Sequence, residues 1–190
     1  MQKNLLAKNP LSGRLFSWFA VVSALLIQGG CATLSRDECI GADWYRVGRE
    51  DGLRGYPYER IEDHRKACGE FGIKPNPTPY RIGRDDGLAH YCTPSSGYEQ
   101  GKSGASYRYV CPRGVEAEFL RGFRVGAQVH DLTQQIHQVD GKIKAKEKDL
   151  EKDKLSDEQR KTLRERIHDL QRERNHLRTL RQTIELMAIF

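Results

Sequence analysis

Hydrophobic positions along the chain follow three different patterns, one after another. Residues 15–27 form an apolar run that only Ser17 and Ser23 interrupt. Further along, aromatic residues are followed by small residues at spacings of three and then four. From residue 125 onward, aliphatic residues recur alternately every four and every three positions. These periods are helical, and no alternating strand pattern accompanies them. The sequence therefore predicts an all-α protein with a short apolar leader, a small helical head and a long helical hairpin.

The head is predicted from a motif that occurs four times, namely an aromatic residue, two residues, a small residue, three residues and a second small residue. On a helix these positions lie on one face. Glycine inside a helix costs up to about 1 kcal/mol relative to alanine, so repeated glycines require a compensating contact. We expect four short helices whose aromatic and glycine faces pack together. The residues of this face are Tyr45, Gly48, Tyr80, Gly83, Tyr98, Gly101, Phe119 and Gly122.

The hairpin is predicted from two heptad-like seams. The first comprises Val125, Val129, Leu132, Ile136, Val139, Ile143, Lys146 and Leu150, and the second Leu163, Ile167, Leu170, Arg174, Leu177, Arg181 and Ile184. Alternation of four and three is the spacing of a coiled coil. Between the seams, Ser156 and Gln159 have the spacing of a capping box, which predicts a helix start after a short turn. Two arms of about 25 residues would form an antiparallel rod of about 37 Å, at 1.5 Å per residue.

Three seam positions are basic instead of apolar, namely Lys146, Arg174 and Arg181. Charged residues at a seam weaken a two-helix hairpin unless acidic residues across it compensate. We expect such pairs. The same positions leave room for a third helix, from a partner or from a second copy of the chain.

The first thirty residues have the order of a secretory signal peptide. Three basic residues and no acidic residue accompany the apolar run, and small residues follow it. The run is about 13 residues, shorter than the roughly 20 that span a bilayer. A transmembrane anchor is therefore the weaker alternative.

Gly29 and Gly30 directly before Cys31 resemble the lipobox of bacterial lipoproteins, although Gln28 stands where an aliphatic residue is usual. The resemblance implies that Cys31 is acylated and becomes the new N-terminus. Ala32 after it implies sorting to the outer membrane, with the chain on the periplasmic side. Several acyl chains anchor a protein far more firmly than one chain does. The expected divisions are a signal peptide at 1–30, a head at 31–115 and a hairpin at 116–190.

Charge changes the picture only slightly. The chain has a net charge of +6, which falls to +3 without residues 1–30, because those contain three basic residues and no acidic one. Charged residues of both signs are spread along the remainder, so we do not expect a nucleic-acid partner.

Four cysteines remain once Cys31 is reserved for lipid, an even number that suits an oxidising compartment and two disulfides. Cys39 and Cys68 lie at the two ends of a predicted helical hairpin, which favours their pairing and leaves Cys92 to pair with Cys111. The other two connectivities remain open. A zinc site is the alternative, but no C-x-x-C pair occurs. We therefore expect no metal and no other cofactor.

Catalytic motifs are absent or incomplete. Residues 97–103 resemble a phosphate-binding loop, but they contain three residues between the glycines where the motif needs four. No serine or cysteine has a local histidine and acid arrangement. The acids at residues 50–51 and 85–86 follow Arg49 and Arg84, where ion pairs are the expected use. The sequence predicts a protein that is not an enzyme.

The motif segments together resemble a known family. The segments are residues 43–52, with Asp43-Trp44-Tyr45 at their start, residues 80–88, Tyr91-Cys92, residues 97–101 and residues 110–112. Over residues 31–127 the chain is similar to a family of uncharacterised Gram-negative lipoproteins, which carry a domain of unknown function. The resemblance implies location and architecture, and no activity.

The expected function is that of a non-enzymatic scaffold or interaction protein in the cell envelope, tethered to the bilayer through acylated Cys31. Its partner would be another envelope protein, or a second copy bound through the coiled coil. The alternative is a ligand-binding module in which the aromatic and glycine faces of the head bind a glycan or peptidoglycan fragment.

Overall fold

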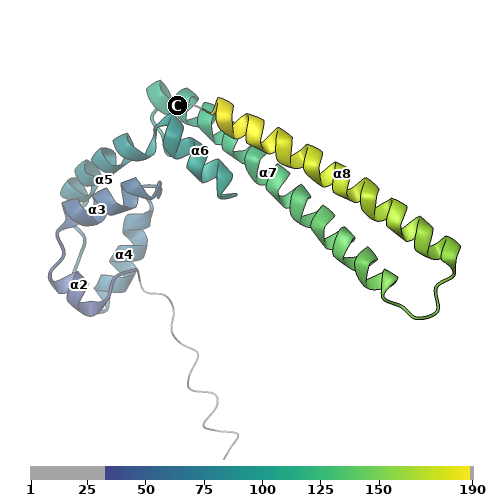
Figure 1. The fold of residues 1–190 in the computed structure, drawn as a ribbon. Helices are drawn as coiled ribbons and strands as arrows, with labels where there is room; N and C mark the ends of the chain where they lie inside the picture. Colours follow the sequence, from purple (N-terminus) through teal and green to yellow (C-terminus); the bar gives the residue numbers. More distant parts are fainter. Residues whose placement is uncertain (1–32, 189–190) are drawn as a thin grey trace, which may run out of the picture.

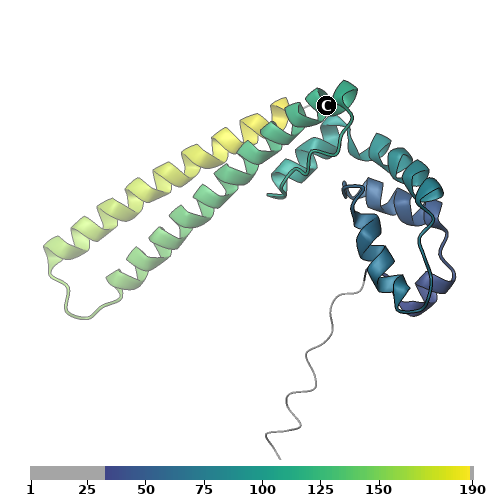
Figure 2. The ribbon, with the colours of Figure 1, turned by 180° about the vertical axis from the view of Figure 1, so that it is seen from behind.

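The computed structural model describes residues 33–188, and within that range the chain is entirely helical, as the sequence predicted. The helices are α2 (Arg36–Ile40), α3 (Trp44–Leu53), α4 (Arg60–Gly69), α5 (Pro77–Tyr91), α6 (Pro94–Lys102), α7 (Arg113–Leu150) and α8 (Asp157–Met187). Helices α2 to α6 and the start of α7 form the head, and the rest of α7 forms a rod with α8 (Figure 1). Seen from behind, the rod joins the head at one end and extends away from it (Figure 2).

Two helix pairs make up the head. Helix α3 packs against α5, and α6 packs against the first part of α7. In each pair the contacts advance in the same direction along both helices, so the paired helices are parallel. The chain returns between α3 and α5 through α4, and between α6 and α7 through the extended segment 103–112.

Two disulfides connect segments that flank the helix pairs. Cys39 on α2 bonds to Cys68 on α4, with 5.4 Å between the Cα atoms. Cys92, after α5, bonds to Cys111, before α7, with 5.6 Å between the Cα atoms. These are the two pairs proposed from the sequence. Closing loops of 29 and 19 residues contributes about 3 to 4 kcal/mol each in the chain-entropy model, a large share for a small core.

The two helix pairs meet at a shared hydrophobic cluster. Leu88 and Tyr91 from α5 pack on Phe119 from α7, and the rings of Tyr91 and Phe119 stack at 5.1 Å. Tyr107 from the connecting segment covers Phe119, and its hydroxyl donates to Glu116 and accepts from the Cys111 amide. Burial raises the Tyr107 pKa to about 12. The neutral phenol therefore fixes the connecting segment to the cluster over the physiological pH range.

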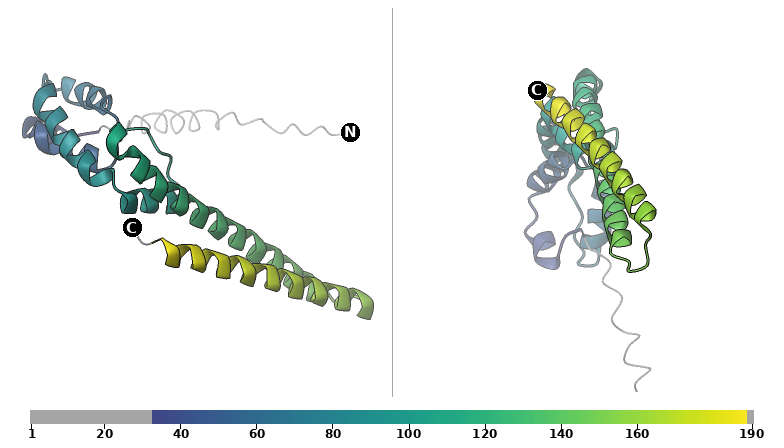
Figure 3. Two further views of the ribbon diagram at one scale, coloured as in Figure 1. Left: turned by 90° about the horizontal axis from the view of Figure 1, so that it is seen from above. Right: turned by 45° about the vertical axis from the view of Figure 1, so that its right-hand side comes forward.

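Helices α7 and α8 run antiparallel and side by side along the rod, with the end of α8 beside the head (Figures 1 and 3). The capping box predicted at the start of α8 is present. Ser156 accepts from the Gln159 amide, and the Gln159 side chain accepts from the Ser156 amide.

Helix boundaries differ from the predictions at two prolines. Helix α5 begins at Pro77, three residues before the first aromatic residue of its predicted repeat, Tyr80, and Asn76 caps it. Proline is tolerated in the first turn, where its missing amide hydrogen has no helical partner. Helix α7 likewise begins directly after Pro112, at Arg113 and not at Glu116.

The predicted signal peptide and the predicted lipidation site at Cys31 lie outside the described residues. Among residues 33–188, no helix combines the length and the apolar character needed to cross a bilayer.

Candidate functional site

The predicted binding face of the head is a packing interface between helix backbones. A Cβ atom on Gly48 would lie 2.0 Å from the carbonyl oxygen of Tyr80, and one on Gly83 would lie 1.9 Å from that of Tyr45. The second pair repeats the arrangement. A Cβ atom on Gly97 would lie 2.2 Å from the carbonyl oxygen of Phe119, and one on Gly122 would lie 1.9 Å from that of Pro94. Only glycine permits such an approach.

Comparison of the two pairs corrects the predicted register of the third repeat. Gly97 takes the place of Gly48, and Gly101 faces the carbonyl of Phe123 just as Gly52 faces that of Arg84. The unit therefore begins at Pro94, and Tyr98 stands four residues later than an equivalent of Tyr45 would. The predicted repeat was aligned on Tyr98, which is aromatic but lies four residues after Pro94, the first residue of the unit.

Most residues of the predicted aromatic and glycine face are buried between helices. Tyr80 and Phe119 have no exposed surface, and Gly48, Gly83, Gly101 and Gly122 are covered by neighbouring backbone. Tyr98 is half-buried beneath the ammonium of Lys102. The face therefore packs helices together over most of its extent.

Tyr45 is the one exposed aromatic residue of that face, and it takes part in a polar bridge between α3 and α5. Its hydroxyl donates to Asp86 at 3.0 Å, and the Arg49 guanidinium donates to the same carboxylate at 2.8 Å. The hydrogen bond from Tyr45, followed by that from Arg49, lowers the pKa of Asp86. The bridge therefore persists in mildly acidic solution.

A buried polar cluster lies on the other side of the first pair, and the sequence did not predict it. One oxygen of Asp51 accepts from the Tyr80 hydroxyl at 2.7 Å and from His64 Nε2 at 2.8 Å. The other ring nitrogen of His64 lies 2.8 Å from the Thr33 hydroxyl, which donates to it in the neutral ring. Burial, and then the bond to Asp51, raises the pKa of Tyr80 far above its usual value.

This cluster joins four segments: the chain just before α2, and helices α3, α4 and α5. Asp51 was expected to pair with a neighbouring arginine, but its carboxylate faces the core and bonds to His64 instead. A sequence offers no signal for such a contact, because the partners come from separate helices. Among residues 33–188, no group of three histidine, cysteine or acidic side chains is placed to hold a metal ion.

The rod has an asymmetric seam. Helix α7 buries five of its predicted seam residues, namely Val129, Leu132, Ile136, Val139 and Ile143. Helix α8 buries only Ile167, and Leu163, Leu170, Leu177 and Ile184 remain partly exposed. The aliphatic side of α7 is therefore well covered, whereas the aliphatic side chains of α8 keep part of their surface exposed.

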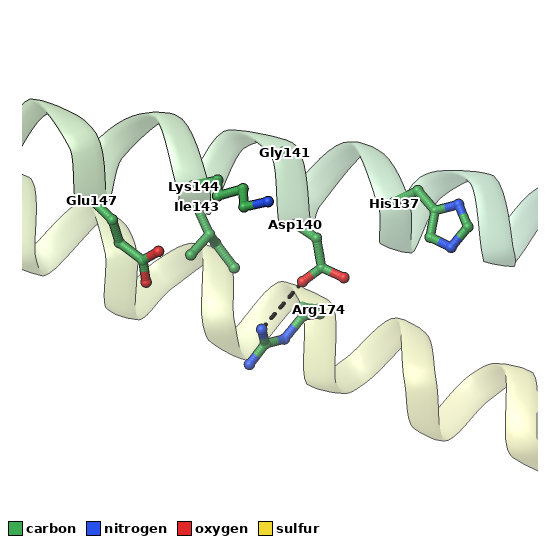
Figure 4. A pocket seen from close by; sticks show the side chains of 7 residues that line it. All are labelled: His137, Asp140, Gly141, Ile143, Lys144, Glu147 and Arg174. Atoms are coloured by element: carbon green, nitrogen blue, oxygen red, sulfur yellow. Dashed lines mark hydrogen bonds and ion pairs between the residues drawn. The ribbon is translucent and has the colours of Figure 1, made fainter.

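A groove of about 500 Å³ runs along one side of the rod (Figure 4). Ile143 provides its apolar part, and charged side chains of both signs surround it. Its lining residues are His137, Asp140, Gly141, Ile143, Lys144, Glu147 and Arg174. All except Arg174 come from α7 (Figure 4).

The three basic seam residues find different partners. Arg174 pairs across the seam with Asp140 at 3.2 Å, whereas Lys146 and Arg181 pair within their own helices, with Asp149 and Glu185. The Nε atoms of Arg174 and Arg181 are buried without a hydrogen-bond acceptor. The expected cross-seam pairing therefore holds for Arg174 only.

Comparison with known proteins gives a family match over part of the chain and no activity. Residues 43–128 match a family described as "Protein of unknown function (DUF2799)", which covers the two helix pairs and ends where the rod leaves the head. Neither the curated proteins nor the solved structures contain a significant match.

Proposed function

We propose that this protein is a non-enzymatic scaffold of the bacterial cell envelope, lipidated at Cys31 and held on the periplasmic face of the outer membrane. The leader and the residues around Cys31 support the anchor. The two disulfides in the head suit an oxidising compartment such as the periplasm.

The observation that carries the proposal is the incompletely covered rod. Helix α8 has 31 residues and buries one of them, whereas the facing side of α7 is continuously aliphatic. Side chains that are half-exposed in a two-helix hairpin become buried when a third helix is added. The rod is therefore suited to receive another helix.

We assign the groove beside Ile143 to an amphipathic helix of another envelope protein. Apolar residues of that helix would contact Ile143, and flanking charges would pair with the rim. The rim offers Lys144 and His137 to acidic partners and Glu147 to basic ones. Rim charges of both signs select a partner by complementarity more than they add affinity.

The head provides a rigid base for this interaction. Backbone contact at eight glycines, two disulfides and the Asp51 cluster fix its helices relative to one another. Because α7 is continuous from the head into the rod, the groove is held at a fixed position relative to the head.

The proposal is tested with a photo-crosslinking amino acid placed in the rod of the lipoprotein in living cells. One position is Glu147, in the groove, and the control is Gln138, nine residues earlier, which a helix places on the opposite face. We expect an adduct with one envelope protein from position 147 and none from position 138. Lys144→Glu should weaken that adduct several-fold, whereas Lys142→Glu, on a different face of α7, should leave it unchanged.

Equal labelling from both positions, or none from either, would contradict a specific helix site. An adduct of the chain with itself from position 147 would assign the groove to a second copy in place of another protein.

A further inference from the structure

A small enclosed cavity lies in the head, next to the buried Asp51 cluster and far from the rod groove. Its volume is about 180 Å³ and its walls are mostly polar. The lining residues come from the segment before α2 and from helices α2, α3 and α4 and the turn after α3. They are Thr33, Leu34, Glu38, Arg46, Val47, Glu50, Asp51, Arg54, Arg60 and His64.

Two of the three arginines in this cavity have unused hydrogen-bond donors. The Arg54 side chain is exposed at the mouth of the cavity and makes no hydrogen bond or ion pair within residues 33–188. Arg60 donates to Asp63 through Nη1 and lies over the Tyr56 ring, but its Nε is buried without an acceptor. A buried charged donor without a partner destabilises the fold, so an acceptor in the cavity would stabilise the head.

The acidic residues of the cavity are mostly engaged elsewhere. Glu38 caps α2 through Ser35, and the bond from the Ser35 amide lowers its pKa. Glu50 pairs with Arg46 at 3.3 Å. Asp51 is 7% exposed and accepts from His64 and Tyr80. No carboxylate of the wall therefore pairs with Arg54, and Arg60 pairs only with Asp63, which lies outside the cavity.

We propose that this cavity binds a small oxyanion, a phosphate or carboxylate group, through Arg54 and Arg60. Guanidinium groups form short charge-assisted hydrogen bonds with such oxygens. At about 30 Å³ per water, the cavity has the room of about six waters, enough for a phosphate or a small carboxylic acid.

The position of the cavity leaves two sources for the anion. Thr33 lines it and stands two residues after Cys31, so a phospholipid headgroup at the membrane surface is one source. A free phosphate or carboxylate of the surrounding solution is the other. Both present the same chemistry to the arginines.

The test uses the full chain purified in detergent, with inorganic phosphate as the probe and chloride at equal ionic strength as the reference. We expect phosphate to shift the ¹H–¹⁵N resonance of Arg60 Nε in a saturable manner. Arg54→Gln should weaken the measured affinity at least about tenfold, as expected for loss of a charge-assisted bond. Arg65→Gln is the control, because Arg65 lies on α4 with an i,i+3 carboxylate partner, as Arg60 does, but outside the cavity.

The same resonance is then followed in nanodiscs that contain phosphatidylglycerol or phosphatidylcholine, without added phosphate. A shift in nanodiscs assigns the site to a lipid headgroup, and a shift with free phosphate alone assigns it to a soluble anion. No saturable shift of Arg60 Nε with phosphate or with acetate, in the unsubstituted and folded protein, would overturn the proposal.

Discussion

Glycine 83 illustrates how the head depends on single residues. Its backbone lies against Tyr45 so closely that an added methyl group would overlap a carbonyl oxygen, which cannot move without the helix. We expect Gly83→Ala to destabilise the head by about 1 to 3 kcal/mol or more, as overpacking does. Urea unfolding of the disulfide-intact protein measures this.

Gly141 provides the matched control for that substitution. It lies in the middle of α7, and a Cβ atom there would meet nothing within 4 Å. Gly141→Ala should stabilise the rod by up to about 1 kcal/mol, because alanine favours a helix. Equal effects of the two substitutions would show that the glycines of the head are not required for close packing.

Asp86 predicts a dependence on pH. Its hydrogen bonds from Tyr45 and Arg49 lower its pKa in the folded state, so the folded protein binds this proton less readily than the unfolded chain. Its contribution to stability is therefore complete above the unfolded pKa of about 3.9 and is lost as the pH falls through the folded value. Asp86→Asn should reduce stability at about pH 7, and the difference from wild type should shrink near about pH 3. A difference that is constant with pH would contradict this assignment.

At the scale of helices, the sequence predicted most of the fold. Periodicity alone identified α3, α5, the long α7 and the return helix α8, because amphipathic spacing and capping are local properties. The register of Tyr98 was missed because the motif fits two alignments, and only the facing helix α7 distinguishes them.

The sites were harder to predict than the helices. The repeated aromatic residues were predicted as a candidate binding face, but their regular spacing results from packing between helices. The contacts of Asp51 with His64 and Tyr80 depend on three helices that no local pattern relates. The cavity beside them was undetectable for the same reason.

Within the rod, Arg174 tests what a charged seam residue contributes. Its side chain is three-quarters buried, pairs with Asp140 and leaves Nε without an acceptor. Arg174→Leu should therefore raise the stability of the hairpin by about 1 kcal/mol or more, since apolar replacement of a buried ion pair is often stabilising. Asp140 would keep its second contact, with Arg178. Circular dichroism melting curves measure the change, and a lower melting temperature would show that the pair is net stabilising.

For the molecule as a whole, the head should fold without most of the rod. Contacts between α6 and α7 extend to His130, which lies against Lys102 and Gly104. A chain that ends at Gln134 keeps them and loses the rest of α7, the turn after it and α8, together with the Lys102 to Glu185 ion pair at 3.1 Å. We expect both disulfides and the near-ultraviolet circular dichroism of the aromatic cluster to be retained. Loss of that signal would show that α8 is part of the folding unit.

The unbroken course of α7 makes the protein a lever. Its 38 residues extend about 57 Å, and the part beyond Gly126 is an arm of about 36 Å. A tilt of the head by about 10° would move the tip of the rod by about 6 Å. Conversely, a force applied at the tip of the rod acts on the glycine contacts between α6 and the start of α7. The resistance of the rod to bending relative to the head is thus determined by the helix contacts within the head.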